Sequence, residues 1–319
     1  MSQNDFRPTA WEDFTGQDQV VQSLKIALAA AAKRKQVLEH ILFYGPPGLG
    51  KTTLAHLVAK AVGVSIKITS GPALTRVGDL ASILTQLEPG DVLFIDEIHR
   101  LNKAVEETLY PVMEDYALDL VVGKGPGARS VRLDLNPFTL IGATTKAGLI
   151  SAPLRDRFGL VHRLRYYQDE DLAGILTTAA KKTGLILDRE SALEIAKRSR
   201  GTARIALKLL RRVADYSEVK HASTPTPATT KKALEFYQVD DLGLDETDRR
   251  LLTAIIKDHA GGPVGLETLA ALISEDVATI TDVYEPFLMQ AGFLARTPRG
   301  RTATPKAYLH LGFEKQGKI

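Results

Sequence analysis

Short apolar runs alternate with amphipathic stretches over the first half of the chain. Three of these runs are Ile41–Tyr44, Asp91–Ile95 and Phe138–Gly142, and the segments between them place apolar residues at helical spacing. Short buried strands separated by helices are typical of a parallel sheet that is covered by helices. The pattern therefore predicts an α/β domain over residues 1–167.

The pattern becomes helical after residue 168. Apolar residues recur every three or four positions in the segments 185–196 and 205–213, which indicates amphipathic helices. A stretch rich in Ser, Thr and Pro, residues 221–230, is expected to form a loop between helices. We therefore expect a small helical domain over residues 168–239.

The last part of the chain combines helices with a hairpin. Short helical patterns begin at residue 245, and two extended runs follow over residues 293–304, joined through Pro298, Arg299 and Gly300. Helices followed by a hairpin suggest a winged-helix domain, which we expect over residues 240–319.

The composition narrows the possible chemistry. The 319 residues are 44% hydrophobic and 25% charged, which is ordinary for a folded protein. No run of roughly 18 apolar residues is present and the N-terminus lacks the order of a secretory signal, so we expect no membrane anchor and a cytoplasmic location. The absence of cysteine excludes disulfides, a thiol nucleophile and zinc fingers, and the seven histidines are not paired at ligand spacing.

Positive charge is concentrated near the C-terminus. The formal net charge is only +3, but residues 290–319 carry six basic side chains against one acidic side chain, Glu314. The charge of this segment suits it to bind a polyanion. Its basic residues are Arg296, Arg299, Arg301, Lys306, Lys315 and Lys318.

Residues 45–52 form a phosphate-binding motif. They read GPPGLGKT, which fits the P-loop pattern, and they lie between the strand that ends at Tyr44 and a helix that begins near Thr52. Backbone N–H groups of such a loop surround phosphate oxygens, its lysine contacts the β and γ phosphates, and its hydroxyl residue binds Mg²⁺. The residues expected to hold a nucleotide here are Gly45, Gly48, Gly50, Lys51, Thr52 and Thr53.

Two further strands end in polar residues. Asp96 and Glu97 follow four apolar residues, so we expect them at the carboxyl edge of the sheet, where ligands bind in open parallel sheets. Asp96 would hold Mg²⁺ through water, and Glu97 would orient and polarise the attacking water. A third strand ends in Thr144 and Thr145, of which we favour Thr145 as the sensor of the γ phosphate. His99 is expected to form a local hydrogen bond rather than to bind a metal.

Taken together, these motifs resemble the AAA+ ATPases, which have a P-loop domain with a parallel sheet and a helical lid. Within them, the chain resembles the RuvB family, the bacterial motors that use ATP and Mg²⁺ to drive Holliday-junction branch migration. The resemblance extends from about Phe6 to Phe313 and departs at Lys146, where many relatives have arginine. The motifs that carry it are GPPGLGKTT (45–53), LFIDEIHR (93–100), PVMEDY (111–116), IGATT (141–145), PLRDRFG (153–159), GTARIA (201–206) and RTPRGR (296–301).

The resemblance assigns nucleotide-binding roles that the patterns alone leave open. It implies that Phe6 and Arg7 line the adenine pocket, and that Tyr167 and Arg204 close over the nucleotide. Arg204 follows a plausible helix start, so a lid helix would aim it at the phosphates. Without the resemblance, Arg204 would be interpreted as a surface arginine.

The resemblance also implies a homo-hexamer whose nucleotide sites lie between subunits. Arg157 would be the arginine finger inserted into a neighbouring site, with Arg155 as its alternate, and such a finger makes hydrolysis depend on assembly. Without the resemblance, Arg157 would be interpreted as part of an ion pair within its own subunit. The residues presented toward the neighbour's nucleotide would be Glu114, Asp115 and Tyr116. The expected catalytic residues are Lys51, Asp96, Glu97, Thr145 and Arg157.

Residues 117–135 read as a hairpin that stands out from the sheet and has a glycine-rich tip. Leu120, Val121 and Val122 are expected to give this arm an apolar surface. On its residues alone this segment is an extra edge hairpin. The resemblance implies instead that it contacts a RuvA-like junction-binding protein, and a RuvC-like resolvase is a further implied partner.

The basic wing, rather than a recognition helix, is expected to bind DNA. Residues 274–292 carry four acidic residues and no Lys or Arg, and Pro286 is expected to kink this helix, so it is unsuited to a major groove. Arg296, Arg299 and Arg301 are instead placed to contact phosphates. Such contacts predict sequence-independent, salt-sensitive binding to the duplex arms of a four-way junction.

Two other functions stay open on the sequence. A clamp-loader-like switch would use ATP to assemble a protein partner on DNA, and a nucleotide-regulated transcription factor would read an operator with its C-terminal domain. The motifs favour an ATP-driven hexameric ring that moves duplex DNA during recombination and repair.

Overall fold

The computed structural model describes residues 6–122, 129–221 and 224–314. The chain divides into two compact units, one of Met1–Ile186 with Gly201–Lys208 and the other of Leu187–Arg200 with Leu209–Ile319. The predicted small helical domain is thus shared between the two units. Among the described residues, no helix has both the length and the apolar character needed to cross a membrane.

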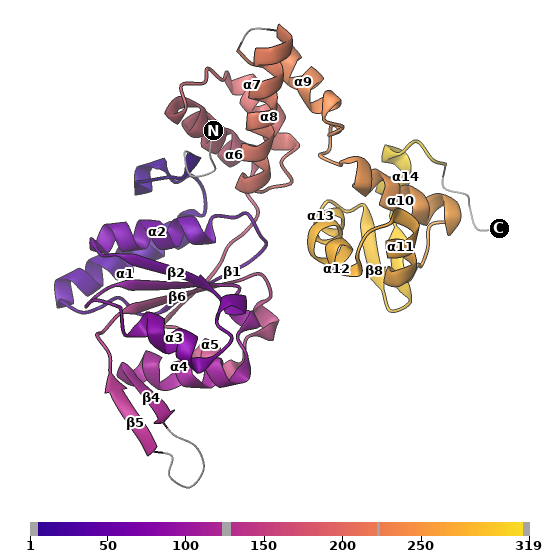
Figure 1. Cartoon of the computed structure of the whole chain (residues 1–319). Helices are drawn as coiled ribbons and strands as arrows, with labels where there is room; N and C mark the ends of the chain where they lie inside the picture. The colour runs from indigo at the N-terminus through magenta and orange to yellow at the C-terminus, as the bar shows by residue number, and fades with distance from the viewer. Residues whose placement is uncertain (1–5, 123–128, 222–223, 315–319) are drawn as a thin grey trace. The chain divides into compact units, whose positions relative to one another are not determined.

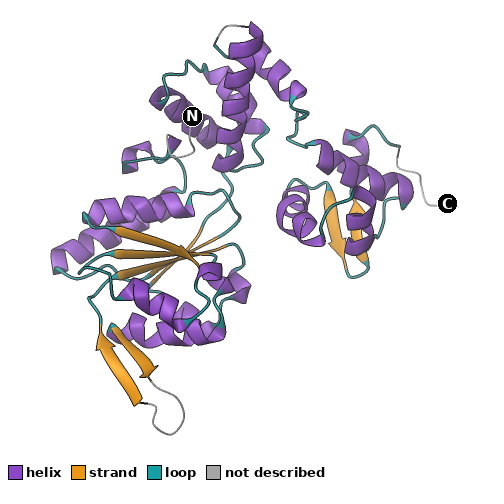
Figure 2. Ribbon diagram, in the orientation of Figure 1, coloured by secondary structure: helices purple, strands orange, loops and turns teal. Residues whose placement is uncertain are grey.

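A five-stranded parallel sheet forms the centre of the first unit (Figure 2). Its strand order is β2-β3-β6-β1-β7, and its three inner strands are almost completely buried. The inner strands correspond to the three predicted apolar runs. The strands are β1 (Ile41–Tyr44), β2 (Ile66–Ser70), β3 (Val92–Asp96), β6 (Thr139–Thr144) and β7 (Leu160–Arg163).

Helices cover both faces of this sheet (Figure 1). Helices α1 (Asp18–Arg34) and α2 (Lys51–Val62) lie on one face, and α3 (Val77–Leu84), α4 (Lys103–Asp115) and α5 (Ala152–Asp156) lie on the other. Leucine, valine and isoleucine side chains of the sheet, α3 and α4 form one buried cluster on the second face. Short 3₁₀ turns occupy Trp11–Asp13, Gly71–Ala73, Ile98–Arg100 and Ala147–Leu149.

The predicted hairpin over residues 117–135 forms a separate two-stranded sheet. Strands β4 (Ala117–Val122) and β5 (Arg129–Asp134) pair antiparallel, and the glycine-rich tip, 123–128, lies outside the described residues. Leu120 was expected, with Val121 and Val122, to give the arm an apolar surface; the side chains of the two valines lie outside the described part of the structure, and Leu120 is half-buried. Leu120 packs with Leu133 against the buried cluster of the first unit, whereas Val131 is 41% exposed.

Four helices follow the sheet: α6 (Asp169–Lys182), α7 (Arg189–Lys197), α8 (Ala203–His221) and α9 (Pro227–Phe236). The predicted loop over residues 221–230 is shorter than expected. Thr226 caps α9 with its side chain and Pro227 occupies the first helical position, where a missing N–H is tolerated. The Ser-, Thr- and Pro-rich composition therefore includes a helix start as well as a loop.

The C-terminal part has the expected winged-helix order around its own hydrophobic core. The acidic helix is irregular next to Pro286, because a π-helical turn immediately precedes α13 and Pro286 lies in the first turn of α13. The elements are α10 (Glu246–Asp258), α11 (Leu266–Ile273), α12 (Val277–Thr279), the π-helical turn Ile280–Tyr284, α13 (Glu285–Gln290), β8 (Leu294–Thr297), β9 (Gly300–Ala303) and α14 (Pro305–His310).

Candidate functional site

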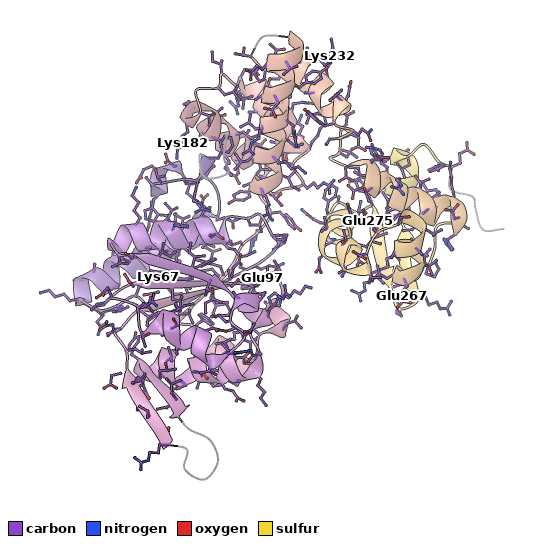
Figure 3. The ribbon with its side chains drawn as sticks, in the orientation of Figure 1. Lys67, Glu97, Lys182, Lys232, Glu267 and Glu275 are labelled. Atoms are coloured by element: carbon purple, nitrogen blue, oxygen red, sulfur yellow. The ribbon has the colours of Figure 1, made fainter. Side chains whose placement is uncertain are left out.

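The predicted catalytic elements meet at the carboxyl edge of the sheet. The P-loop follows β1, Asp96 ends β3, and Thr144 ends β6, which lies between β1 and β3. Glu97 follows Asp96 directly and lies at the same edge (Figure 3). The sheet therefore brings together three chain segments that are distant in sequence.

The P-loop wraps closely around its own lysine. Lys51 is only 7% exposed, and its ammonium donates hydrogen bonds to the carbonyls of Gly45 (2.7 Å) and Pro46 (2.9 Å). Burial lowers the pKa of Lys51, while the charges of Asp96 and Glu97 oppose that change. A buried ammonium bonded to neutral carbonyls is favourably placed to receive phosphate oxygens.

Gly48 explains why the loop needs glycine at its tip. Its φ of +80° lies in the left-handed region, and a Cβ added there would come within 2.8 Å of the Cβ of Arg204. The N–H of Arg204 donates to the carbonyl of Gly48 over 3.3 Å. The start of α8, which was predicted to close over a nucleotide, therefore contacts the P-loop directly, with the Arg204 side chain exposed.

The donor groups near Lys51 fit a nucleotide-bound Mg²⁺ better than a free metal. Thr52 offers a hydroxyl and Asp96 a carboxylate, which are oxygen ligands of the type Mg²⁺ prefers. Among the described residues, no group of three or more His, Asp or Glu side chains could hold a metal by itself. Mg²⁺ commonly takes one or two carboxylates together with substrate phosphates, and this site matches that arrangement.

Glu97 and Thr145 lie side by side. The Thr145 hydroxyl is 3.4 Å from Oε2 of Glu97, and the Glu97 N–H donates to Asp96 over 2.9 Å. Thr144 is fully buried and its Oγ1 bonds Nδ1 of His99 over 2.8 Å. The geometry thus favours Thr145 over Thr144 as the group beside the reacting phosphate, and it gives His99 the local hydrogen bond that was expected.

Of the two N-terminal residues predicted for the adenine pocket, Phe6 is buried and Arg7 contacts α2. Phe6 is 5% exposed, and a guanidinium nitrogen of Arg7 lies 2.8 Å from Nε2 of His56. Burial and the charge of Arg7 both lower the pKa of His56. His56 was not predicted, although it follows Thr52 by four residues and so shares its helix face.

Tyr167, the last residue of the predicted α/β domain, contacts the P-loop. Its buried hydroxyl donates to the carbonyl of Leu49 over 2.9 Å, and burial raises its pKa. Its ring lies against Gly16 and its hydroxyl against Gly50. Tyr167 therefore fixes the loop backbone, a contact compatible with the predicted role beside the nucleotide.

Arg157 binds to its own subunit. It forms an ion pair with Glu114 (3.1 Å), donates to the carbonyl of Pro153 (2.7 Å), and lies 4.3 Å above the ring of Tyr110. The alternate candidate, Arg155, is half exposed and 3.9 Å from Asp156. Tyr110 was not predicted, yet it lies one helical turn before Glu114 on α4.

The three residues expected to face a neighbouring nucleotide differ from one another. The side chains of Glu114 and Asp115 are more than half exposed, and Asp115 pairs with Arg132 of the hairpin over 3.0 Å. Tyr116 instead packs edge-on against His40 and Phe138. Tyr116 therefore contributes mainly to the core beneath the hairpin.

The three arginines of the wing differ in exposure. Arg296 is exposed on β8, and Arg299 is exposed in the turn between β8 and β9. Arg301 differs from the expectation, because its guanidinium bonds both carboxylate oxygens of Glu285 (2.8 and 3.1 Å) and its side chain is 12% exposed. Its pairing follows from the burial of Glu285, whose side chain is 4% exposed and needs a cation.

The remaining basic residues of this segment are used differently. Lys306 donates to the carbonyl of Ala291 over 2.8 Å and lies 4.7 Å above the ring of Phe293. Lys315 and Lys318 lie outside the described residues. The exposed basic surface of the described wing therefore centres on Arg296 and Arg299.

Comparison with protein families covers nearly the whole chain. Residues 6–164 match the P-loop domain of the Holliday junction DNA helicase RuvB, residues 167–240 the RuvB AAA lid domain, and residues 241–312 the RuvB C-terminal winged-helix domain. The chain belongs to the RuvB family. A RuvB subunit of the Holliday junction branch migration complex from Chloroflexus aggregans is 60% identical over 306 residues, which are 96% of this chain and 87% of that protein.

Solved RuvB structures agree with the fold. The RuvB Holliday junction branch migration motor of Thermotoga maritima is 50% identical with a TM-score of 0.87, covering 97% of this chain and 99% of that one. A variant of the same protein, with one proline replaced by glycine, gives a TM-score of 0.88 at the same identity and coverage. The fold prediction, a AAA+ P-loop domain followed by a lid and a winged-helix domain, is confirmed.

Proposed function

We propose that this RuvB-family protein is an ATP-driven motor that moves Holliday junctions during homologous recombination and DNA repair, working as a hexameric ring on duplex arms. It is an ATP hydrolase of the AAA+ P-loop class. The observation that supports the proposal best is the convergence of Lys51, Asp96, Glu97 and Thr145 at one sheet edge, in a chain that also carries an exposed basic wing.

The residues at the sheet edge divide the chemistry of hydrolysis. Lys51 would exchange its two carbonyl partners for phosphate oxygens, and Thr52 with Asp96 would hold Mg²⁺, which neutralises phosphate charge when bound. Glu97 would orient the attacking water and accept its proton. Thr145, beside Glu97, would couple the position of that carboxylate to the presence of the γ phosphate.

The phosphate site is completed by an arginine from a neighbouring subunit. Arg157 would leave Glu114 and enter that neighbour's site, where such a finger is worth ~10³ to 10⁵ in turnover. Glu114 and Asp115 would lie at the same subunit boundary, and Phe6, Arg7, Tyr167 and Arg204 would enclose the nucleotide. A single subunit should therefore hydrolyse ATP slowly.

The wing supplies the contact with DNA. Arg296 is exposed on β8 and Arg299 is exposed in the turn that follows it, where both can contact phosphates without reading bases. Arg301 would support the wing from inside through Glu285 rather than contact DNA. This division of roles favours binding that is independent of sequence and sensitive to salt.

The proposed motor would act together with other proteins at the junction. The β4–β5 hairpin would contact a RuvA-like junction-binding protein, and a RuvC-like resolvase would act on the same junction. A cytoplasmic location follows from a chromosomal substrate in bacteria. The domains would span residues 1–167, 168–239 and 240–319.

A mobile synthetic four-way junction tests the function directly. The protein is incubated with the junction, ATP·Mg²⁺ and a RuvA-like partner, and strand separation is followed with time. We expect separation with the wild type and none with Lys51→Ala, because that variant lacks the phosphate-binding cation. ATP hydrolysis without any strand separation by the wild type would contradict the motor and favour a clamp-loader-like switch.

A further inference from the structure

Two arginines separated by one residue hold the segment that joins α9 to α10. Arg198 is 3% exposed, and its Nε donates to the carbonyl of Asp240 over 2.9 Å. Its other two nitrogens pair with the carboxylates of Glu194 and Asp241. The lid helix α7 and the start of the winged-helix segment are therefore joined through one guanidinium group.

Arg200 extends this contact into the core of the winged-helix domain. It donates to the carbonyl of Gly243 (2.9 Å) and to the carboxylates of Asp245 (2.8 Å) and Asp248 (2.6 Å). Its guanidinium lies 4.5 Å above the ring of Phe287, a buried residue of the winged-helix core. Several hydrogen bonds from one planar fork fix geometry in a way that a lysine cannot reproduce.

The backbones of the two segments are also in direct contact. A Cβ added at Gly243 would come within 2.8 Å of the carbonyl oxygen of Arg198, so only glycine fits there. Arg200 itself has a φ of +53°, a conformation that non-glycine residues adopt at a cost and keep only when their surroundings fix it. The contacts of its side chain provide such fixing. We call Arg198 and Arg200, with the segment 240–248, the linker clamp.

The chain passes from the linker clamp to the phosphate site within a few residues. The carbonyl of Gly201 accepts a hydrogen bond from the N–H of Tyr167 (2.9 Å), and the N–H of Arg204 donates to Gly48 of the P-loop (3.3 Å). The chain passes from one compact unit to the other between Arg200 and Gly201, as it also does after Ile186 and after Lys208. A movement of the segment 201–204 therefore displaces its chain neighbour Arg200, which is hydrogen-bonded to the winged-helix segment.

We propose that Arg198 and Arg200 are positioning residues of the motor, which lock the winged-helix domain to the turn before α8 so that nucleotide-driven movement reaches the wing instead of being absorbed as bending of the linker. The inference rests on the proposed function, because it concerns how efficiently hydrolysis moves DNA. Neither residue touches the phosphate site or the exposed wing. Their loss should separate the two activities instead of abolishing hydrolysis.

The decisive variant is Arg200→Ala, measured for ATP consumed and junction separated in the same reaction. We expect ATP hydrolysis of the assembled protein to remain within about twofold of the wild type, while strand separation per ATP falls by at least about fivefold, the lower range of measured coupling between sites. The matched control is Arg250→Ala. Arg250 is an exposed arginine on α10, the helix that carries Asp248, and it donates to the carbonyl of Ile273 within the winged-helix domain.

A structural measurement decides whether the clamp holds the two parts together. Because the chain has no cysteine of its own, the double variant K232C/E267C carries spin labels at these two positions and nowhere else. Both positions are exposed, the first on α9 and the second on α11 (Figure 3). We expect the distribution of distances between the labels to broaden in Arg200→Ala but not in Arg250→Ala. Asp241→Ala removes only an exposed partner of Arg198, so the fold should persist, and it should give a smaller broadening of the same kind.

The outcomes separate this inference from the proposed function. An unchanged distance distribution and unchanged strand separation per ATP in Arg200→Ala would overturn the clamp, even if the wild type is an active motor. If the wild type separates no strands, the motor function fails, and the label distances still decide whether Arg200 holds the winged-helix domain. Restoration of coupling by Arg200→Lys would show that charge suffices and would overturn the role given to the planar fork.

Discussion

His40 is held neutral by burial and by the hydrogen bond that its Nδ1 accepts. Its Nδ1 accepts from the N–H of Leu140 (2.9 Å), and its Nε2 donates to the carbonyl of Met113 (3.0 Å). A backbone N–H can only donate, so Nδ1 must carry no proton. Burial lowers the pKa of His40 accordingly. This neutral imidazole joins β6 to the end of α4, directly below the hairpin.

The protonation of His40 predicts a pH-dependent stability of the first unit. Above its unfolded pKa of about 6.5 the ring is neutral in both states, and the stabilisation is fully present. As pH falls below that value the unfolded chain takes up a proton that the folded chain resists, so stability decreases, by at most about 1.4 kcal/mol per pH unit. Urea unfolding monitored through Trp11, the one tryptophan, measures this change.

The control for this prediction is His40→Gln, which has no titratable ring. We expect it to be less stable than the wild type at pH 7.5 and to show a shallower loss of stability between pH 7 and 5, values chosen to bracket the unfolded pKa of about 6.5. His56 and His162 also have lowered pKa values through burial, so the comparison uses the difference between the two proteins. Identical pH profiles would refute the assignment.

At the residue scale, the sequence predicted the parts of the site that a local motif encodes. Lys51, Asp96 and Thr145 were found because each follows or ends a recognisable buried strand. The partners His56 and Tyr110 were missed because a side chain's choice of neighbour depends on packing between elements. The pairing of Arg301 was missed for the same reason, since its acidic partner lies 16 residues earlier in sequence.

At the element scale, the wing predicts two different kinds of arginine variant. Replacing Arg296 and Arg299 with alanine removes two exposed phosphate contacts. We expect weaker binding to every duplex sequence and a salt-dependence slope reduced by about 2, at roughly 0.9 for each contact. Fluorescence anisotropy with two unrelated duplexes at several salt concentrations measures both quantities.

The matched variant in the wing is Arg301→Ala. It leaves Glu285 buried without its cation, so the winged-helix domain should lose several kcal/mol of stability. The salt slope of any folded fraction should change little. A full loss of one phosphate contact in Arg301→Ala, with unchanged domain stability, would restore the original assignment of Arg301 to DNA.

Elements were predicted best where burial is most complete. The inner strands β1, β3 and β6 are buried on both faces and stood out as apolar runs. The edge strands β2 and β7 were not singled out, because their partly exposed pattern is not distinctive in a single sequence. Helix α14 is short and lies within the basic C-terminal segment, where charge dominated the pattern.

At the scale of the whole molecule, the proposed finger predicts complementation between inactive variants. Arg157→Ala keeps an intact phosphate site but offers no finger, and Lys51→Ala offers a finger but lacks the phosphate-binding lysine. Each should hydrolyse ATP at least ~10³-fold more slowly than the wild type, whereas an equal mixture should recover about a quarter of the wild-type rate, because that share of neighbouring pairs combines both intact parts.

The mixing experiment requires only a steady-state ATPase assay at concentrations that favour assembly. A mixture that stays inactive, or an Arg157→Ala protein as active as the wild type, would exclude a finger supplied by a neighbour.

The order of the three domains was predicted from the sequence, because each has its own periodicity. The division into two compact units was not, because it cuts helix α8 after Lys208, and no break in periodicity marks that point.

The length of helix α8 turns a small tilt at one end into a larger displacement at the other. Its 19 residues form a rod of about 28 Å, at 1.5 Å per residue. Its first turn contacts Gly48, so a tilt of only roughly ten degrees about that end would sweep the other end through about 5 Å. That displacement is comparable to the 3.4 Å rise between successive nucleotides of DNA. A small rearrangement around the phosphates, amplified along a helix of this length, is therefore enough to match the spacing of successive nucleotides.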